Sequence, residues 1–369
     1  MMEQLATHGD QRQCSALVPP PARRFPAYPA SWYLFCRAND LRRGPFSRTM
    51  LGRRLVAYRT AAGPVSILDA RCAHLGADLG RGRVLGDHLQ CPFHHWEYGP
   101  DGRCIHIPTT AAIPAFARQR CYPVAERHGF VFFFNGPVPL FSLPFFFDED
   151  PNAFVAGKSF RFIGTCAWYM LAANGFDGEH FRAVHDRTLI GPPQVDCPAP
   201  FARRMRYRAQ VTGNSLFDRL LRCFAGPLVD VSITSWGGPF ILVTGFFRRA
   251  RSYILIATQP LDHEHTLIEA IVLAPRSTPI VLRPLSLWVR RTFTRGFVRD
   301  DITRLASIRY SAHTLLESDR LLIEYFAWAA ALPNFAGEAR GETNGRAEKG
   351  NCRVSNHVPD ERTLSPETV

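Results

Sequence analysis

Four residues of the types that bind metals stand in two short segments of this chain. Cys72 and His74 are separated by one residue, Cys91 and His94 by two, and sixteen residues lie between the segments. Two thiolates and two imidazoles suit tetrahedral zinc, or a [2Fe–2S] centre with both histidines on one iron. Zinc fingers usually pair cysteine with cysteine first. Each segment here offers one of each kind, which favours the two-iron cluster and requires a fold that brings two turns together.

The sequence around these segments predicts a small all-β domain. From residue 32 to 134, short apolar stretches alternate with turn-forming residues, which is the pattern of short strands. Residues 160–335 instead combine several strand-like stretches with helical ones, and this mixture predicts an α+β domain with an antiparallel sheet. The expected helices span residues 168–184, 285–297 and 303–330. The expected strands span residues 204–211, 229–236, 241–247, 252–259 and 267–273.

Composition predicts where the folded part of the chain begins and ends. Residues 1–27 are polar and then proline-rich, which predicts a flexible arm, and residues 337–369 lack hydrophobic periodicity, which predicts a disordered tail. The two domains would then span residues 28–137 and 138–336. At 46% hydrophobic residues, the 369-residue chain can bury two cores. No basic and then apolar leader opens the sequence, so we expect no signal peptide.

A second group of metal-binding residues lies in the run NGFDGEHFRAVH, within the first expected helix. Asn174, Asp177, His180 and His185 belong to it. Positions five apart differ by about 140° around an ideal helix, so the helix must distort or end for His180 and His185 to meet one ion. Two histidines and one carboxylate form the ligand set of non-haem Fe(II) oxygenases.

Together the two groups resemble the Rieske non-haem iron oxygenases. The motif C-P-F-H-x-W, which ends at Trp96, is similar to the motif of the oxygenases among Rieske proteins. Ala77 and Phe93 stand where Rieske proteins of respiratory complexes carry an extra pair of cysteines. The chain departs from the family at His95, where glycine is common, and we interpret His95 as an exposed residue. The resemblance covers roughly residues 28–330. It implies a Rieske domain followed by a catalytic domain with the helix-grip (Bet v 1/START-like) fold.

The resemblance also implies roles for the second group. His180 and His185 would bind the mononuclear Fe(II). Asp177 would connect an iron-ligand histidine by hydrogen bonds to a cluster histidine of the neighbouring subunit, with His94 as its partner. Asn174 would lie near the iron.

In the family, the third iron ligand lies far downstream of the two histidines, in a C-terminal helix with the motif E-D-K/R-x-x-x-E. The stretch SDRLLIE is similar to that motif, and it predicts Asp319 as the carboxylate ligand. Glu317 is the nearest alternative, and Glu324 is a weaker one.

The expected function is that of a terminal oxygenase with a Rieske [2Fe–2S] cluster and mononuclear Fe(II). The stretch C-A-H-L-G-A-D-L is more similar in sequence to 3-ketosteroid hydroxylases and cholesterol 7-desaturases than to naphthalene-type dioxygenases. It favours hydroxylation, demethylation or desaturation of a hydrophobic ring compound, steroid-like or aromatic, with O₂. Three alternatives stay open: an O- or N-demethylase of a small aromatic, a Rieske electron-transfer protein with a non-catalytic second domain, and a zinc-binding regulatory protein.

The expected electron donor follows from motifs that the sequence lacks, and the expected oligomeric state follows from the family resemblance. No G-x-G-x-x-G follows a strand, and no plant-type ferredoxin cysteine pattern is present, so electrons must come from a separate NAD(P)H-dependent reductase or ferredoxin. The family implies a homotrimer. The net charge of +12 is almost all arginine, and we expect no nucleic acid as partner. The arginine-rich residues 290–299 are interpreted as a solvated face. The sharper alternatives for them are ferredoxin docking and peripheral contact with an anionic membrane. A cytoplasmic location is expected.

Overall fold

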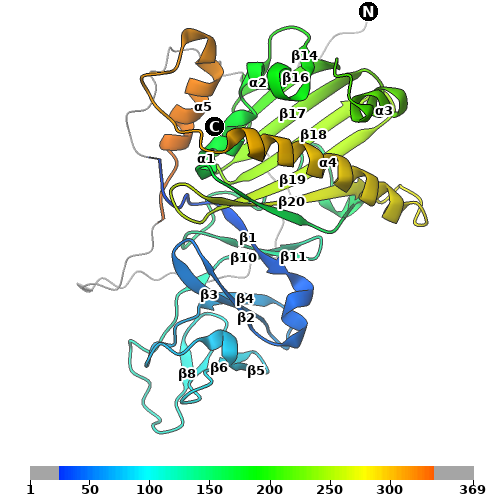
Figure 1. Cartoon of the computed structure of the whole chain (residues 1–369). Helices are drawn as coiled ribbons and strands as arrows, with labels where there is room; N and C mark the ends of the chain where they lie inside the picture. The colour runs from blue at the N-terminus through cyan, green and yellow to red at the C-terminus, as the bar shows by residue number, and fades with distance from the viewer. Residues whose placement is uncertain (1–24, 336–369) are drawn as a thin grey trace, which may run out of the picture.

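The computed structural model describes residues 25–335, and these form an all-β N-terminal domain and a larger mixed domain (Figure 1). The expected disordered tail and nearly all of the expected N-terminal arm lie outside the described residues. Within residues 25–335, no helix is both long enough and apolar enough to cross a bilayer.

The N-terminal domain consists of three small antiparallel sheets. In the first, the strand order is β1 (Trp32–Arg37), β11 (Phe130–Phe134) and β10 (Val124–Arg127). The second contains β2 (Phe46–Met50), β3 (Arg53–Arg59), β4 (Val65–Asp69) and β9 (Cys121–Tyr122), and the third contains β5 (Arg83–Leu85), β6 (His88–Gln90), β7 (Glu97–Tyr98) and β8 (Cys104–His106). The third sheet lies at the tip of the molecule that is farthest from the second domain (Figure 1).

The second domain is a long antiparallel sheet with helices on one face. The sheet order is β12 (Phe154–Ala156), β20 (Thr266–Pro275), β19 (Arg251–Pro260), β18 (Phe240–Phe247), β17 (Leu228–Trp236), β16 (Ala202–Val211) and β14 (Arg187–Leu189). In addition, β13 (Phe160–Gly164) pairs with β20, and β15 (Gln194–Asp196) pairs with β16. The helices are α1 (Trp168–Asn174), α2 (Gly178–His185), α3 (Leu216–Phe224), α4 (Arg283–Leu305) and α5 (Arg320–Ala330). The long helix α4 crosses the sheet, as the helix-grip prediction requires (Figure 1).

Three helix expectations differ from the structure. The expected helix over residues 168–184 is split into α1 and α2, because the chain leaves the helix after Asn174 and Asp177 caps a new one. The expected helix over residues 303–330 is interrupted, because α4 ends at Leu305 and α5 begins only at Arg320. Helix α3 was not expected. Its local signal is the pair Ser215 and Asp218, since the serine hydroxyl caps the helix by accepting from the Asp218 amide at 3.1 Å.

One hydrophobic core runs through the junction between the domains. Trp32, Phe132 and Phe134 of the N-terminal domain belong to the same buried cluster as Phe240 and Tyr253 of the large sheet. Burying large aromatic side chains is the strongest apolar contribution that a junction can receive. The two domains therefore pack as one body, although the chain passes between them near residue 137.

The two ends of the described chain meet at this junction. Phe25, expected in the flexible arm, stacks on Tyr169 of α1 with ring centroids 3.7 Å apart. The amide nitrogen Nδ2 of Asn135 donates to the carbonyl oxygens of Tyr28, Pro29 and Phe335. Phe25 therefore packs on the catalytic half through an aromatic ring, although the polarity of residues 1–27 predicted a flexible arm there.

Candidate functional site

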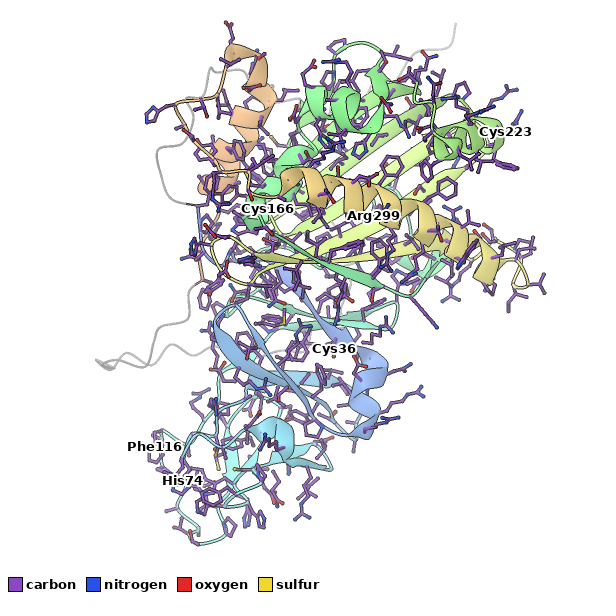
Figure 2. All side chains as sticks on the ribbon, viewed as in Figure 1. Cys36, His74, Phe116, Cys166, Cys223 and Arg299 are labelled. Carbon is purple, nitrogen blue, oxygen red and sulfur yellow. The ribbon has the colours of Figure 1, made fainter. Side chains whose placement is uncertain are left out.

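The four residues of the first group lie on two adjacent loops at the tip of the N-terminal domain. The first loop is closed by the Cys72 amide, which donates to the Ala77 carbonyl at 2.9 Å, and the second by the Cys91 amide, which donates to the Trp96 carbonyl at 2.8 Å. Both thiols are buried, whereas the side chains of His74 and His94 reach the surface. The label of His74 in Figure 2 marks this tip.

The two imidazoles lie side by side. The ring centroids of His74 and His94 are 4.6 Å apart, and the indole of Trp96 stacks on His74 at 4.8 Å with an interplanar angle of 1°. Trp96 is itself buried. The tryptophan of the C-P-F-H-x-W motif therefore fixes the orientation of an exposed histidine.

The environment of the thiols fits a metal cluster. Burial raises the pKa of the Cys91 thiol, and the adjacent Cys72 raises it further, so a cationic group is needed to hold Cys91 as a thiolate. Tyr98 Oη lies 3.1 Å from Cys72 Sγ and accepts a hydrogen bond from the Ala73 amide. Burial, followed by Cys72, raises the pKa of Tyr98. Its hydroxyl thus keeps a proton that can be donated to a ligand sulfur.

His95 is exposed and has a left-handed backbone, with φ of 57°. Glycine adopts this conformation without steric cost, whereas a residue with a Cβ does so at some cost in energy. The glycine common in the family therefore matches a turn that this chain forms with histidine.

The second group is positioned by a break between α1 and α2. Helix α1 ends at Asn174, and α2 begins at Gly178. Asp177 caps α2, because its Oδ1 accepts from the amides of Glu179 at 3.0 Å and His180 at 3.1 Å. At the other end, α2 stops at His185, because Asp186 has a left-handed φ of 50°. His185 can therefore turn toward His180, as the five-residue spacing required.

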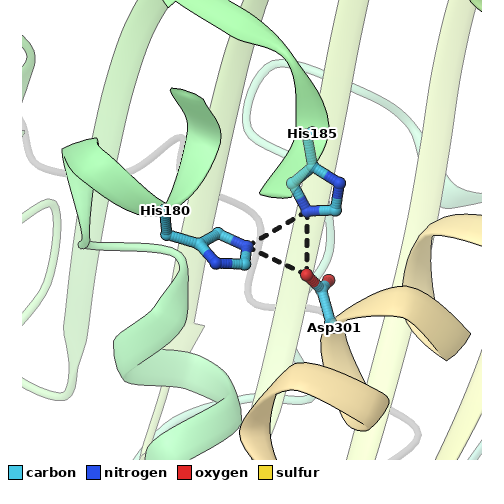
Figure 3. A group of neighbouring side chains, drawn as sticks. All are labelled: His180, His185 and Asp301. Carbon is cyan, nitrogen blue, oxygen red and sulfur yellow. Dashed lines mark hydrogen bonds and ion pairs between the residues drawn. The ribbon is translucent and has the colours of Figure 1, made fainter. Parts of the chain in front are cut away.

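His180 and His185 converge with a carboxylate from α4, that of Asp301 (Figure 3). Asp301 Oδ1 lies 2.9 Å from His180 Nε2 and 2.8 Å from His185 Nε2, and the two nitrogens are 3.1 Å apart. Ligand atoms about 2.1 Å from one ion, at right angles, are separated by about 3.0 Å. The three side chains thus fit a single six-coordinate metal ion.

The local electrostatics keep the carboxylate ionised. Burial raises the pKa of Asp301, but hydrogen bonds to His180 and His185 outweigh this effect, so its pKa is lower than usual. Asn174 adds a contact, because its Nδ2 donates to Asp301 Oδ1 at 3.2 Å. The same nitrogen lies 2.9 Å from His180 Nε2. The structure thus places Asn174 beside His180 and Asp301, and its role near an iron ion stays a prediction.

The structure does not bring Asp319, the expected carboxylate ligand, to the two histidines. Asp319 lies in the turn before α5, where its carboxylate accepts a hydrogen bond from the Leu316 amide at 2.9 Å. Of the two alternatives, Glu317 is exposed in the same turn, and Glu324 forms an ion pair with Arg320 at 2.9 Å. The physical reason is the interruption of the expected helix, which leaves Asp319 as a turn residue.

A sequence signal for Asp301 exists within α4. Val298 and Leu305 are buried, and Asp301 lies between them at helical spacing on the same face of the helix. An acidic residue on a buried face needs a partner, and the two histidines supply it.

A buried ion pair holds the C-terminal end of α2 in place. Arg187 Nη1 lies 2.8 Å from Asp218 Oδ1, and both side chains are 8% exposed. The same Nη1 donates to the His185 carbonyl at 2.6 Å. The Phe297 ring lies between these groups: it contacts the Arg187 guanidinium at 5.4 Å and the His185 ring at 4.9 Å. The backbone and the ring of His185 are therefore both held by buried partners.

Comparison with known proteins agrees with this geometry. Residues 31–117 match the model of the Rieske [2Fe–2S] domain. The chain is 39% identical over 165 residues to aminopyrrolnitrin oxygenase PrnD of Pseudomonas fluorescens, across 42% of this chain and 46% of that protein. It is 35% identical over 213 residues to cholesterol 7-desaturase nvd of Drosophila melanogaster, across 52% and 49%. The chain thus spans about half the length of the curated relatives it matches.

The fold beyond the Rieske domain is also known. The crystal structure of dicamba monooxygenase bound to dicamba superposes with a TM-score of 0.62 at 19% identity, covering 82% of this chain and 96% of that one. The expected α+β fold class is confirmed by this likeness. The chain therefore contains a Rieske [2Fe–2S] domain, followed by a domain with the fold seen in dicamba monooxygenase.

Proposed function

We propose that this chain is a terminal oxygenase that oxidises a hydrophobic ring compound with O₂. The observation that carries the proposal is the convergence of His180, His185 and Asp301 on one point, in a chain that also contains a Rieske domain. Three protein ligands leave coordination positions open, as in non-haem Fe(II) oxygenases. The cluster would supply electrons singly and the iron would activate O₂, while Cys72, His74, Cys91 and His94 hold the cluster.

The protein's own part is to shape and orient the iron site. Asn174 donates to the Asp301 carboxylate and so fixes which of its oxygens faces the histidines. Arg187 and Phe297 hold His185 in place. Such supporting contacts typically change metal affinity or activity by about 10–100-fold when they are removed.

An apolar face of the sheet supports a hydrophobic substrate. Met205, Ile233, Val243 and Ile254 are cross-strand partners on four consecutive strands, so their side chains share one face. All four belong to the same apolar cluster as Phe181, the residue next to His180. The names of the relatives cover aminopyrrolnitrin and cholesterol, both consistent with a ring compound as substrate. Demethylation of a small aromatic is the alternative reaction.

The positions of the two sites support a homotrimer. The cluster loops lie at one tip of the molecule, and the His180–His185–Asp301 group lies in the opposite half (Figures 1 and 2). Electrons would therefore pass between neighbouring subunits, with Asp177 at the start of α2 as the link to His94. The first electron donor would be a separate ferredoxin or reductase. We further propose a cytoplasmic location, since the cysteines of the sequence lack the pattern of a small secreted domain.

The test is electron paramagnetic resonance on anaerobically reduced, iron-loaded protein treated with nitric oxide. A Rieske signal together with an iron–nitrosyl signal that steroids or methoxyarenes perturb is the expected result. A Rieske signal without a nitrosyl signal would contradict the proposal and favour an electron-transfer protein. A colourless zinc protein would contradict it as well.

A further inference from the structure

One end of the catalytic domain exposes large apolar side chains from two helices. On α3, Leu216 is 74% exposed and Phe224 is 72% exposed, with Leu220 between them. At the start of α4 and in the turn before it, Val281 is 81% exposed and Trp288 is 62% exposed. Ile280, Leu282 and Leu285 are also exposed. Exposed apolar groups that cluster in this way usually mark an interaction site.

These segments form one continuous surface. The Phe217 ring of α3 packs on Phe293 of α4 with centroids 4.3 Å apart. The turn between β18 and β19 connects the two helices, because Arg249 Nη1 donates to the Cys223 carbonyl at 3.1 Å and Arg290 donates to the Arg251 carbonyl. We call residues 213–228, 246–252 and 276–299 the α3–α4 patch. In Figure 2, the label of Cys223 marks its α3 side.

Helix α3 is apolar on two sides. Leu216, Leu220 and Phe224 follow one another at intervals of four and face solvent, while Phe217 faces α4. A helix that needed only to cover the protein core would carry polar residues on its outer side. The outer row of α3 therefore lacks a partner among the residues that the structure describes.

The charge of the α3–α4 patch is positive. Its three segments contain eleven arginines and a single acidic residue, Asp218. Asp218 is buried and paired with Arg187, so it does not offset the surface charge. The patch thus combines aromatic and aliphatic side chains with a surrounding set of cations, which is the composition of helices that lie in the interface of an anionic membrane.

We propose that the α3–α4 patch docks the protein on the surface of a membrane that contains anionic phospholipid. The apolar side chains would lie among the acyl chains, and the arginines would bind the phosphate groups. An aromatic path leads inward from the patch, since Phe217 contacts Phe297 at 5.4 Å and Phe297 contacts the His185 ring. Docking would therefore place a lipid phase next to the proposed iron site. That last step rests on the proposed function, whereas docking does not.

The experiment uses the full chain and vesicles of two compositions. One set is phosphatidylcholine alone, and the other is equimolar phosphatidylcholine and phosphatidylglycerol. Trp288 is the one tryptophan of six with an exposed side chain, so its fluorescence reports on the patch. We expect co-sedimentation and a blue shift of the emission with the anionic vesicles only, both weakened by salt.

Variants assign the binding to the patch. The double substitution Leu216→Glu and Leu285→Glu keeps Trp288 as the reporter and should lower the vesicle-bound fraction at least about tenfold. The matched control Val138→Glu alters a side chain that is 64% exposed outside the patch and should bind as before. Circular dichroism checks that each variant is folded.

Several outcomes would overturn the proposal. They are the absence of binding to anionic vesicles, and binding that the double substitution leaves unchanged. A third is a lower oligomeric mass in the folded double variant, which would identify the patch as a contact between subunits. Vesicle binding needs neither metal, so a failed nitrosyl experiment would leave this test intact.

Discussion

Asp301 is the residue on which the assignment of the iron site depends. It reaches the two histidines from a helix that lies more than one hundred residues downstream, and its carboxylate is largely buried. Removing an acidic ligand leaves two imidazoles, which hold a divalent ion far less tightly.

We predict that Asp301→Ala loses mononuclear iron and keeps the Rieske cluster. The affinity for iron should fall by more than about 100-fold, which exceeds the usual effect of losing a group that only supports a ligand. The matched control is Asp319→Ala, which should retain iron because that carboxylate accepts from a backbone amide instead. Metal analysis and the visible spectrum measure the two centres separately. Loss of iron in the Asp319 variant alone would contradict the assignment.

His128 provides a test of stability against pH. Burial, reinforced by Arg127 and Arg276, lowers the pKa of His128 to about 4. Between pH 6.5 and 4 the unfolded chain therefore binds more protons than the folded one, so stability falls as the pH falls through that range. The group is partly solvated, and we expect a contribution of about 1–2 kcal/mol.

The variant His128→Asn should remove this acid sensitivity. Asparagine also tolerates the left-handed φ of 53° at this turn. Urea unfolding of both proteins at pH 7 and at pH 5 measures the difference. An equal loss of stability on acidification in the two proteins would exclude His128 as its source.

At the scale of elements, the end of α2 depends on a buried ion pair. Asp218→Asn would leave the Arg187 guanidinium buried without its counter-charge, which typically costs about 3–5 kcal/mol. Since the same guanidinium holds the His185 carbonyl, iron affinity should fall as well.

An exposed pair of the same kind is the control. Asp230→Asn breaks the contact of Asp230 with Arg208, in which both side chains are more than half exposed. Exposed pairs contribute little to stability, because solvent screens them. Thermal unfolding and iron titration should separate the two variants clearly. Equal effects would mean that the buried pair does not support the site.

The elements also show what the sequence could predict and why. The two cluster loops depend on local spacing and turn residues, which the sequence shows. The α1–α2 break was not predicted, because the expected helix ran continuously over residues 168–184, although Asp177 caps α2. The third candidate ligand depends on a contact between α2 and α4. The spacing of Asp301 to Val298 and Leu305 indicates a buried face, but it does not indicate the two histidines as partners. Asp319 was favoured because its stretch resembled a family motif, but the helix expected there is interrupted.

At the scale of the whole molecule, the proposed trimer can be tested by mixing two inactive variants. His94→Ala removes a cluster ligand, and Asp301→Ala removes the iron ligand. If electrons cross between subunits, trimers that contain both variants regain activity, because an intact cluster can face an intact iron site. The expected recovery is a fraction of the wild-type rate, on the order of one site in three or fewer, since only some neighbours are correctly paired.

Co-expressed chains with two different affinity tags isolate the mixed trimers. Each variant alone is the control and should be inactive. Mixed trimers that remain inactive, although both metals are present at the expected content, would show that electrons stay within one chain.

The junction at Asn135 has a consequence for how the molecule is made. One side chain holds carbonyls from Tyr28, Pro29 and Phe335, so residues from both ends of the described chain are needed to complete the same contact. During synthesis the N-terminal half emerges long before Phe335 does. The domains can begin to fold in turn, but this contact between them forms only after Phe335 has been synthesised. A nascent chain stalled before residue 335 should therefore remain sensitive to proteases at the junction.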